Sequence, residues 1–153
     1  MKLIHLDDKQ IHGLKVRTNN AAEMQPASGK IGPLWQQFHA RYGSRLNAGT
    51  PVYGVYHEYQ SDMHADFSVL AGTTADSLAA ASADNAMAEV TLVAGDYLQF
   101  SAEGEMPGSV IDLWGRVWAY FASADCPYRR RYLTDFECYP NDSRVEICIG
   151  VVG

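Results

Sequence analysis

The chain carries the same aromatic-rich hairpin pattern twice, and this repeat limits the folds that it can adopt. Residues 128–151 alternate apolar and polar side chains on both sides of a turn, and residues 53–72 have the same layout. The later copy places Glu137 among aromatic side chains, and the earlier copy places Glu58 at the matching position. Alternation with a period of two is typical of half-buried strands. We therefore predict two related units, each of which ends in a hairpin with one acid.

A helix is predicted ahead of each hairpin. Apolar side chains recur every three or four positions in residues 30–42 and again in residues 109–123, which gives each segment one apolar face. Pro33 fits the first turn of the earlier helix, where a missing N–H costs little. The prominent rings of these helices are Trp35, Phe38, Trp114 and Trp118. Rings at this spacing either pack in the core or contact a bound ligand, and both interpretations stay open.

Strands complete each unit. The first unit, at about residues 10–75, is expected to have strands at 10–18, 51–60 and 65–73, with a loop at 21–28. The second, at about residues 88–153, is expected to have strands at 88–94 and 97–101 and the closing hairpin at 129–151, after a small polar linker at 76–85. Two such β-α-β-β units in one antiparallel sheet give an α+β domain. We expect both helices on one face and a ligand groove between the halves, on the face that the helices leave open.

Composition narrows the class of protein. The 153 residues suit one domain that buries its core without disulfides or metal, and the net charge of -6 has the wrong sign for gripping a phosphate backbone. The chain shows no apolar run of signal-peptide or membrane-spanning length.

The cysteines of the closing hairpin are not predicted to form a disulfide. A turn centred on residues 141 and 142 would set Cys138 opposite Val145 and Cys148 opposite Asp135, out of register for a bridge. Together with Cys126, they are expected to be reduced thiols in the cytoplasm.

Four runs of residues carry a family resemblance. They are Lys-Ile-Gly-Pro-Leu-Trp-Gln-Gln-Phe at 30–38, Ala-Gly-Asp-Tyr-Leu-Gln-Phe at 94–100, Trp-Gly-Arg-Val-Trp at 114–118 and Thr-Asp-Phe-Glu-Cys-Tyr at 134–139. In order and spacing, the chain resembles the GyrI-like family, the effector-binding domain of AraC- and MerR-type multidrug regulators, and above all its free-standing bacterial branch. The resemblance covers nearly the whole chain and implies that the acid of the last hairpin, here Glu137, pairs with cationic or polar aromatic ligands.

The predicted site combines this resemblance with strand geometry. Period-two alternation puts Asp135, Glu137 and Tyr139 on one face of their strand and Phe136 on the other. If the helices cover the Phe136 face, Glu137 lies in the open groove, and the repeat places Tyr56 and Glu58 at mirrored positions. The alternative is a solvent-facing strand glutamate. The full set of predicted ligand-binding residues is Glu137, Glu58, Tyr56, Tyr97, Trp114, Trp118, Tyr139, Trp35 and Asp135.

The predicted function is the binding of a cationic or amphipathic aromatic small molecule, linked to transcription regulation or to drug sequestration. Some GyrI-like proteins hydrolyse electrophilic compounds, so a hydrolase with Glu137 as general base is the alternative. No cofactor is expected, and no metal site, because His57, Glu58 and His64 do not match the His-Glu-x-x-His pattern. We expect no direct contact with nucleic acid or membrane. A partner protein or a second copy of the chain stays open.

Overall fold

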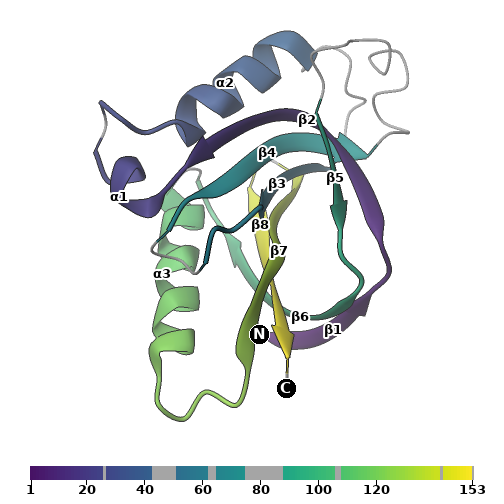
Figure 1. Cartoon of the computed structure of the whole chain (residues 1–153), viewed down its shortest axis with the longest axis vertical. Coiled ribbons are helices and arrows are strands. Elements are labelled where there is room, and N and C mark those ends of the chain that lie inside the picture. Colours follow the sequence, from purple (N-terminus) through teal and green to yellow (C-terminus); the bar gives the residue numbers. More distant parts are fainter. Residues whose placement is uncertain are drawn as a thin grey trace.

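The computed structural model describes residues 1–25, 27–42, 51–61, 65–74, 88–105, 108–141 and 143–152. Figure 1 shows how the elements follow one another. In chain order they are β1 (Lys2–Leu6), β2 (Lys9–Thr18), α1 (Asn20–Glu23), α2 (Ile31–Tyr42), β3 (Val52–His57), β4 (Phe67–Thr74), β5 (Ala88–Leu92), β6 (Gly95–Glu103), α3 (Gly108–Ala122), β7 (Arg129–Asn141) and β8 (Arg144–Val152).

The described strands form one antiparallel sheet in the order β1-β6-β8-β7-β3-β4-β2-β5. The first strands of the two hairpins, β3 and β7, are neighbours at its centre, where Val55 of β3 lies opposite Phe136 of β7. The prediction of an α+β fold with a single antiparallel sheet is confirmed.

Two short links force this sheet to curl. Only Asp7 and Asp8 separate β1 from β2, although these strands lie near opposite edges of the sheet, and only Val93 and Ala94 separate β5 from β6. Each link can span at most about 10 Å, so the two edges must come close together, as Figure 1 shows. The backbone N–H of Ala94 donates to the Asp8 carboxylate at 2.7 Å and joins the two links. The sheet therefore has a concave inner face and a convex outer face.

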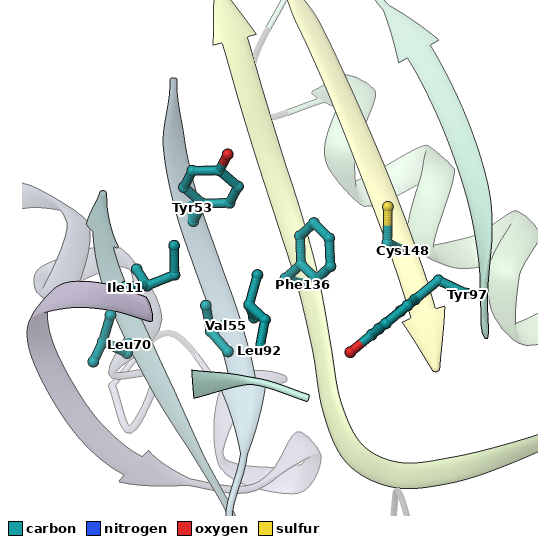
Figure 2. Packing of buried hydrophobic residues seen from close by; sticks show 8 residues of the cluster. All are labelled: Ile11, Tyr53, Val55, Leu70, Leu92, Tyr97, Phe136 and Cys148. Carbon is teal, nitrogen blue, oxygen red and sulfur yellow. The ribbon is translucent and has the colours of Figure 1, made fainter. Parts of the chain in front are cut away.

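The inner face is filled with side chains. Figure 2 shows eight of them converging from several strands: Ile11, Tyr53, Val55, Leu70, Leu92, Tyr97, Phe136 and Cys148. The expectation that the face without helices stays open is wrong, because the curl closes that face around its own core. Phe136 belongs to this inner core, so Glu137, the next residue, points to the outer face where the helices lie.

Both longer helices pack on the outer face, each against its own part of the sheet. Leu34, Phe38 and Tyr42 of α2 form a core with residues of β2 and β4. Leu113 and Val117 of α3 form another core with residues of β6 and β8. The central strands β3 and β7 therefore lie beneath the gap between the two helices. The prediction of both helices on one face is confirmed.

Most predicted elements match those observed, and two were not predicted. The strand β1 has no counterpart among the expected strands, and α1 lies in a segment expected to be a loop. The short helix begins at an N-cap, because the side chain of Asn19 accepts a hydrogen bond from the backbone N–H of Ala22. The predicted linker at 76–85 lies outside the described residues, as do parts of both hairpin turns. None of the helices that the structure describes has the length and apolar character needed to cross a membrane.

The closing hairpin pairs one residue away from the predicted register. Cys138 lies opposite Glu146 and Asp135 lies opposite Ile149, and β7 has irregular pairing between Arg130 and Asp135. The three cysteines are free, as expected. The irregular segment includes Tyr132, whose φ of 55° is left-handed. Such a bulge changes the face to which a side chain points, and it affects the site described next.

Candidate functional site

Glu137 is a buried acid on the outer face of β7 that three side chains hold by hydrogen bonds. Its Oε2 accepts hydrogen bonds from the hydroxyl of Tyr56 at 2.8 Å and from the indole Nε1 of Trp114 at 2.6 Å. Its Oε1 accepts a third from the hydroxyl of Tyr139 at 2.8 Å. The donors come from β3, α3 and β7, so the carboxylate joins three elements.

The environment of Glu137 is dry. The residue is 4% exposed, and burial raises the pKa of its carboxyl group, although the hydrogen bonds from Trp114, Tyr139 and Tyr56 oppose this shift. Burial and the neighbouring carboxylate also raise the pKa of the Tyr56 and Tyr139 hydroxyls, which therefore stay protonated and act as donors. Among the described residues, Glu137 has no cationic partner. The site is an acid held by neutral donors.

A glycine makes room for this carboxylate. Gly54 of β3 lies directly opposite Glu137. A Cβ at position 54 would lie 2.9 Å from Oε1 of Glu137 and 3.0 Å from the Trp35 ring. Trp35 in turn contacts Tyr139 edge-on, with ring centroids 5.5 Å apart. The absence of a side chain at Gly54 thus lets the acid and its aromatic neighbours pack together.

A pocket of about 360 Å³ lies beside this acid, between α1, the start of α2, and α3. It is lined by Asn20, Glu23, Met24, Ile31, Tyr56, Tyr59, Phe67, Ile111, Trp114, Trp118 and Arg130. Its volume falls within the range of small-molecule sites. Met24, Ile111 and Trp118 are exposed to solvent, so the pocket opens between apolar side chains.

Glu137 lies behind the pocket wall rather than in it. Tyr56 and Trp114 line the pocket and also donate to the carboxylate, and their rings meet edge-on with centroids 5.2 Å apart. Donation to a carboxylate increases the electron density of both rings. A positive group in the pocket would therefore lie next to two electron-rich rings that have a carboxylate behind them.

A second acid of β7 is neutralised within the protein. Asp135 is fully buried, and its Oδ2 accepts from Arg130 at 2.7 Å and from the Tyr59 hydroxyl at 2.5 Å. Its Oδ1 accepts from the backbone N–H of Gly150. Residues five positions apart lie on opposite faces of a regular strand, and the bulge between Arg130 and Asp135 brings them together. Arg130 lines the pocket with its charge already paired.

The structure brings most of the predicted site residues to one place. Tyr56, Trp114 and Trp118 line the pocket, and Glu137 lies behind the first two. Tyr139 donates to Glu137, and Trp35 packs against Tyr139, but neither is among the residues that line the pocket. Asp135 holds Arg130, which does line it.

Glu58 does not reach the pocket. Strand β3 ends at His57, and Glu58 has a left-handed φ of 52°, which turns its side chain outward. The side chain is 52% exposed, and its Oε1 accepts from the ammonium group of Lys15 at 3.0 Å. Hydrogen bonds from Ser68 and Lys15 lower the pKa of this carboxyl group. Glu58 therefore matches Glu137 in the sequence repeat but not in its place relative to the pocket.

Tyr97 also lies elsewhere, on the inner face of the sheet. Its hydroxyl donates to the carbonyl oxygen of Val93 at 2.6 Å and lies 2.8 Å from Oγ1 of Thr134. The neighbouring residue Leu98 packs with the α3 core. Alternation along β6 therefore turns Tyr97 away from the helices.

Several pocket residues were not predicted from the sequence. Ile111 of α3 is one helical turn from Trp114, and Trp118 is one turn further, so the 3.6-residue period placed all three on one helix face. This helical spacing could have identified Ile111 from the sequence, whereas no sequence pattern points to α1, to Tyr59 or to Arg130 in its bulge. Among the described residues, no three His, Cys, Asp or Glu side chains gather as a metal ion would require.

Comparison with known proteins gives consistent matches. The family model for Cass2, described as an integron-associated effector binding protein, matches residues 2–151. An integron cassette protein from the mobile metagenome of Vibrio cholerae is 40% identical, with a TM-score of 0.89 over 99% of this chain and 95% of that one. SAV2435, solved with tetraphenylphosphonium bound, has the same fold at 21% identity, with a TM-score of 0.75 over 99% of this chain and 93% of that one.

A curated relative comes from Bacillus subtilis (strain 168). It is the "Putative transcriptional regulator protein YobU", which is 26% identical over 150 residues, or 94% of this chain and 88% of that protein. These matches confirm the GyrI-like resemblance and the prediction of an effector-binding, small-molecule-binding domain.

Proposed function

Because the chain belongs to the family of integron-associated effector-binding proteins, we propose that its pocket binds a bulky, lipophilic aromatic cation. The observation that carries this proposal is the position of Glu137 behind Tyr56 and Trp114, which both line the pocket. The ligand's rings would contact the apolar wall, and its positive charge would face the two electron-rich rings.

The energetics of Glu137 support a cation rather than a neutral ligand. A buried carboxylate without a cation is unfavourable, and hydrogen bonds from neutral donors offset only part of the loss of hydration. A cation next to an aromatic ring gains about 0.5–1 kcal/mol at an exposed site and about 2 kcal/mol when water is excluded. A ligand charge therefore supplies the partner that the described residues do not provide.

The relatives support the same chemistry and a link to gene regulation. SAV2435 was solved with tetraphenylphosphonium, a tetrahedral aromatic cation, and the Bacillus subtilis relative carries the name of a regulator. With a net charge of -6, this chain has the wrong sign for binding the phosphate backbone directly. An effect on transcription would pass through a partner protein or through removal of the free ligand.

The test uses two ions of the same shape and opposite charge. Tetraphenylphosphonium and tetraphenylborate are titrated against the protein, with tryptophan fluorescence or calorimetry as readout. The cation is expected to bind with a dissociation constant on the order of micromolar, ~8 kcal/mol, and the borate much more weakly. Equal affinities would mean that the pocket recognises apolar surface alone, and failure of both ions to bind would contradict the proposal.

Hydrolysis with Glu137 as general base stays an alternative prediction. A general base needs to reach a water or substrate proton within hydrogen-bond distance. The two carboxylate oxygens of Glu137 already accept from three donors, and Tyr56 and Trp114 stand between it and the pocket. This arrangement favours binding over turnover.

A further inference from the structure

Glu23 is a second carboxylate at the pocket, on the wall formed by α1 and the start of α2. Its oxygens accept from the Thr18 hydroxyl at 2.5 Å and from the backbone N–H groups of Lys30 at 2.8 Å and Ile31 at 3.1 Å. All three donors are neutral. The ammonium group of Lys30 instead donates to the carbonyl oxygen of Arg17.

The charges around the pocket do not cancel. Arg130 is paired with Asp135 at 2.7 Å, which neutralises the positive group that lines the pocket. Glu23 and Glu137 remain, and among the described residues neither forms an ion pair with Lys, Arg or His. The pocket therefore has two uncompensated acids on different walls.

These two acids differ in depth. Glu137 is 4% exposed and lies behind the rings of Tyr56 and Trp114. Glu23 is partly exposed and precedes Met24, whose side chain is exposed at the opening. A ligand that enters between the apolar side chains would have its inner end near Glu137 and its outer part near Glu23.

We propose that the pocket is selective for dications. The aromatic cationic group would lie against Tyr56 and Trp114 in front of Glu137, and a second positive group on a short flexible arm would lie beside Glu23. This inference rests on the proposed function, because it assumes that the first cation binds in this pocket. It adds the class of ligand: an amphipathic aromatic cation with a basic or quaternary ammonium side arm.

The test compares two probes that differ in one atom. Both are triphenylphosphonium ions with a butyl arm, which ends in trimethylammonium in the dication and in tert-butyl in the matched monocation. The arms have the same shape, so the ratio of the two affinities isolates the second charge. At low salt, we expect the dication to bind about tenfold more tightly, which is ~1.4 kcal/mol.

Two variants assign the effect to one acid. Glu23→Gln keeps a carbonyl acceptor for the start of α2 but removes the charge, so the affinity for the dication should fall by a larger factor than the affinity for the monocation, and the advantage of the dication should disappear. Retained binding of the monocation by this variant also reports that the pocket is intact. Glu137→Gln should weaken both probes by the same factor and keep the ratio.

The outcomes separate this inference from the proposed function. If neither probe binds wild type, cation binding itself is contradicted. If the monocation binds and the dication gains nothing, or if the gain persists in Glu23→Gln, the dication inference alone is overturned. If Glu23→Gln disturbs α2, the salt dependence of wild type decides: because Glu23 is partly exposed, the ratio must fall as ionic strength rises. A ratio independent of salt would contradict the role of Glu23.

Discussion

The β3–β4 and β7–β8 hairpins carry their acids at matching positions of the sequence pattern, yet the two acids have opposite environments. Glu137 lies within β7, is buried and accepts from neutral donors. Glu58 follows the end of β3, is 52% exposed and pairs with Lys15. The end of the regular strand, one residue before the acid or beyond it, decides whether the carboxylate is buried behind the pocket or faces the solvent.

The pKa shifts of the two acids express the same difference. Burial raises the pKa of Glu137, whereas hydrogen bonds from Ser68 and Lys15 lower the pKa of Glu58. Under the proposed function, the acid that the protein holds without a cation is the one that a ligand's charge would approach. An acid that already has a cation is part of the surface.

The largest expected effect comes from adding a side chain at Gly54 of β3, in the space that the Glu137 carboxylate of β7 now occupies. Gly54→Val would place side-chain atoms where Oε1 of Glu137 and the Trp35 ring now lie. We expect a loss of about 3 kcal/mol in the free energy of unfolding, because such overpacking displaces a buried charged group as well as a ring. Urea melts measure it.

The matched control for this variant is Gly32→Ala in α2. A Cβ at position 32 has no neighbour within 4 Å, so stability should stay within about 1 kcal/mol and not fall, since alanine favours helix. A Gly54→Val protein as stable as wild type would mean that the carboxylate can move away at little cost.

The next effect separates the two acids by function. Glu137→Gln should weaken tetraphenylphosphonium binding about 30-fold, ~2 kcal/mol, because a neutral amide replaces the charge behind the ring wall. Glu58→Gln should change the affinity less than about twofold, because its carboxylate is solvated and screened. Calorimetric titration of both variants measures these changes. An equal loss in both would show that the repeat places both acids at the ligand.

The smallest effect concerns stability against pH, where the two acids act with opposite sign. The folded pKa of Glu137 is raised, so its penalty appears as pH rises above the unfolded value near 4.3 and persists above the folded pKa. The folded pKa of Glu58 is lowered, so its contribution is present above about 4.3 and is lost as pH falls through the folded pKa.

Urea melts at about pH 7 and about pH 4 test this prediction. Glu137→Gln should be neutral or stabilising by up to about 1 kcal/mol at the higher pH, because its amide can accept from Tyr56 and Trp114 and donate to Tyr139. Glu58→Gln should be neutral or destabilising by at most about 0.5 kcal/mol. A loss above about 2 kcal/mol in Glu137→Gln would mean that this acid is structurally paired.

The sequence predicted the elements well because their periods are local. The apolar spacing of α2 and α3 and the alternation of β7 and β8 follow from neighbouring residues, and the structure confirms them. The short α1 could not be foreseen, because four residues contain too little periodicity. The edge strand β1 shares this problem, since its five residues are mostly exposed.

The site was harder to predict because it depends on which face is covered. Alternation grouped Asp135 with Glu137 and separated them from Phe136, but it could not say which group faces the helices. The curl of the sheet decided that, and it depends on pairings between distant segments. The end of β3 before Glu58 and the bulge before Asp135 are likewise set by tertiary contacts.

The two short links at the sheet edges also have a consequence for folding kinetics. They place β1 beside β6 and β5 beside β2, so Lys2 pairs with Gln99 and Lys9 with Leu92. Such pairs form only after long loops have closed, and chains rich in them fold slowly. Until then β6 and β2 each present an unpaired edge on which another chain can pair. Because such pairing between chains increases with concentration, we expect the refolding yield to fall as the protein concentration rises, with or without a ligand.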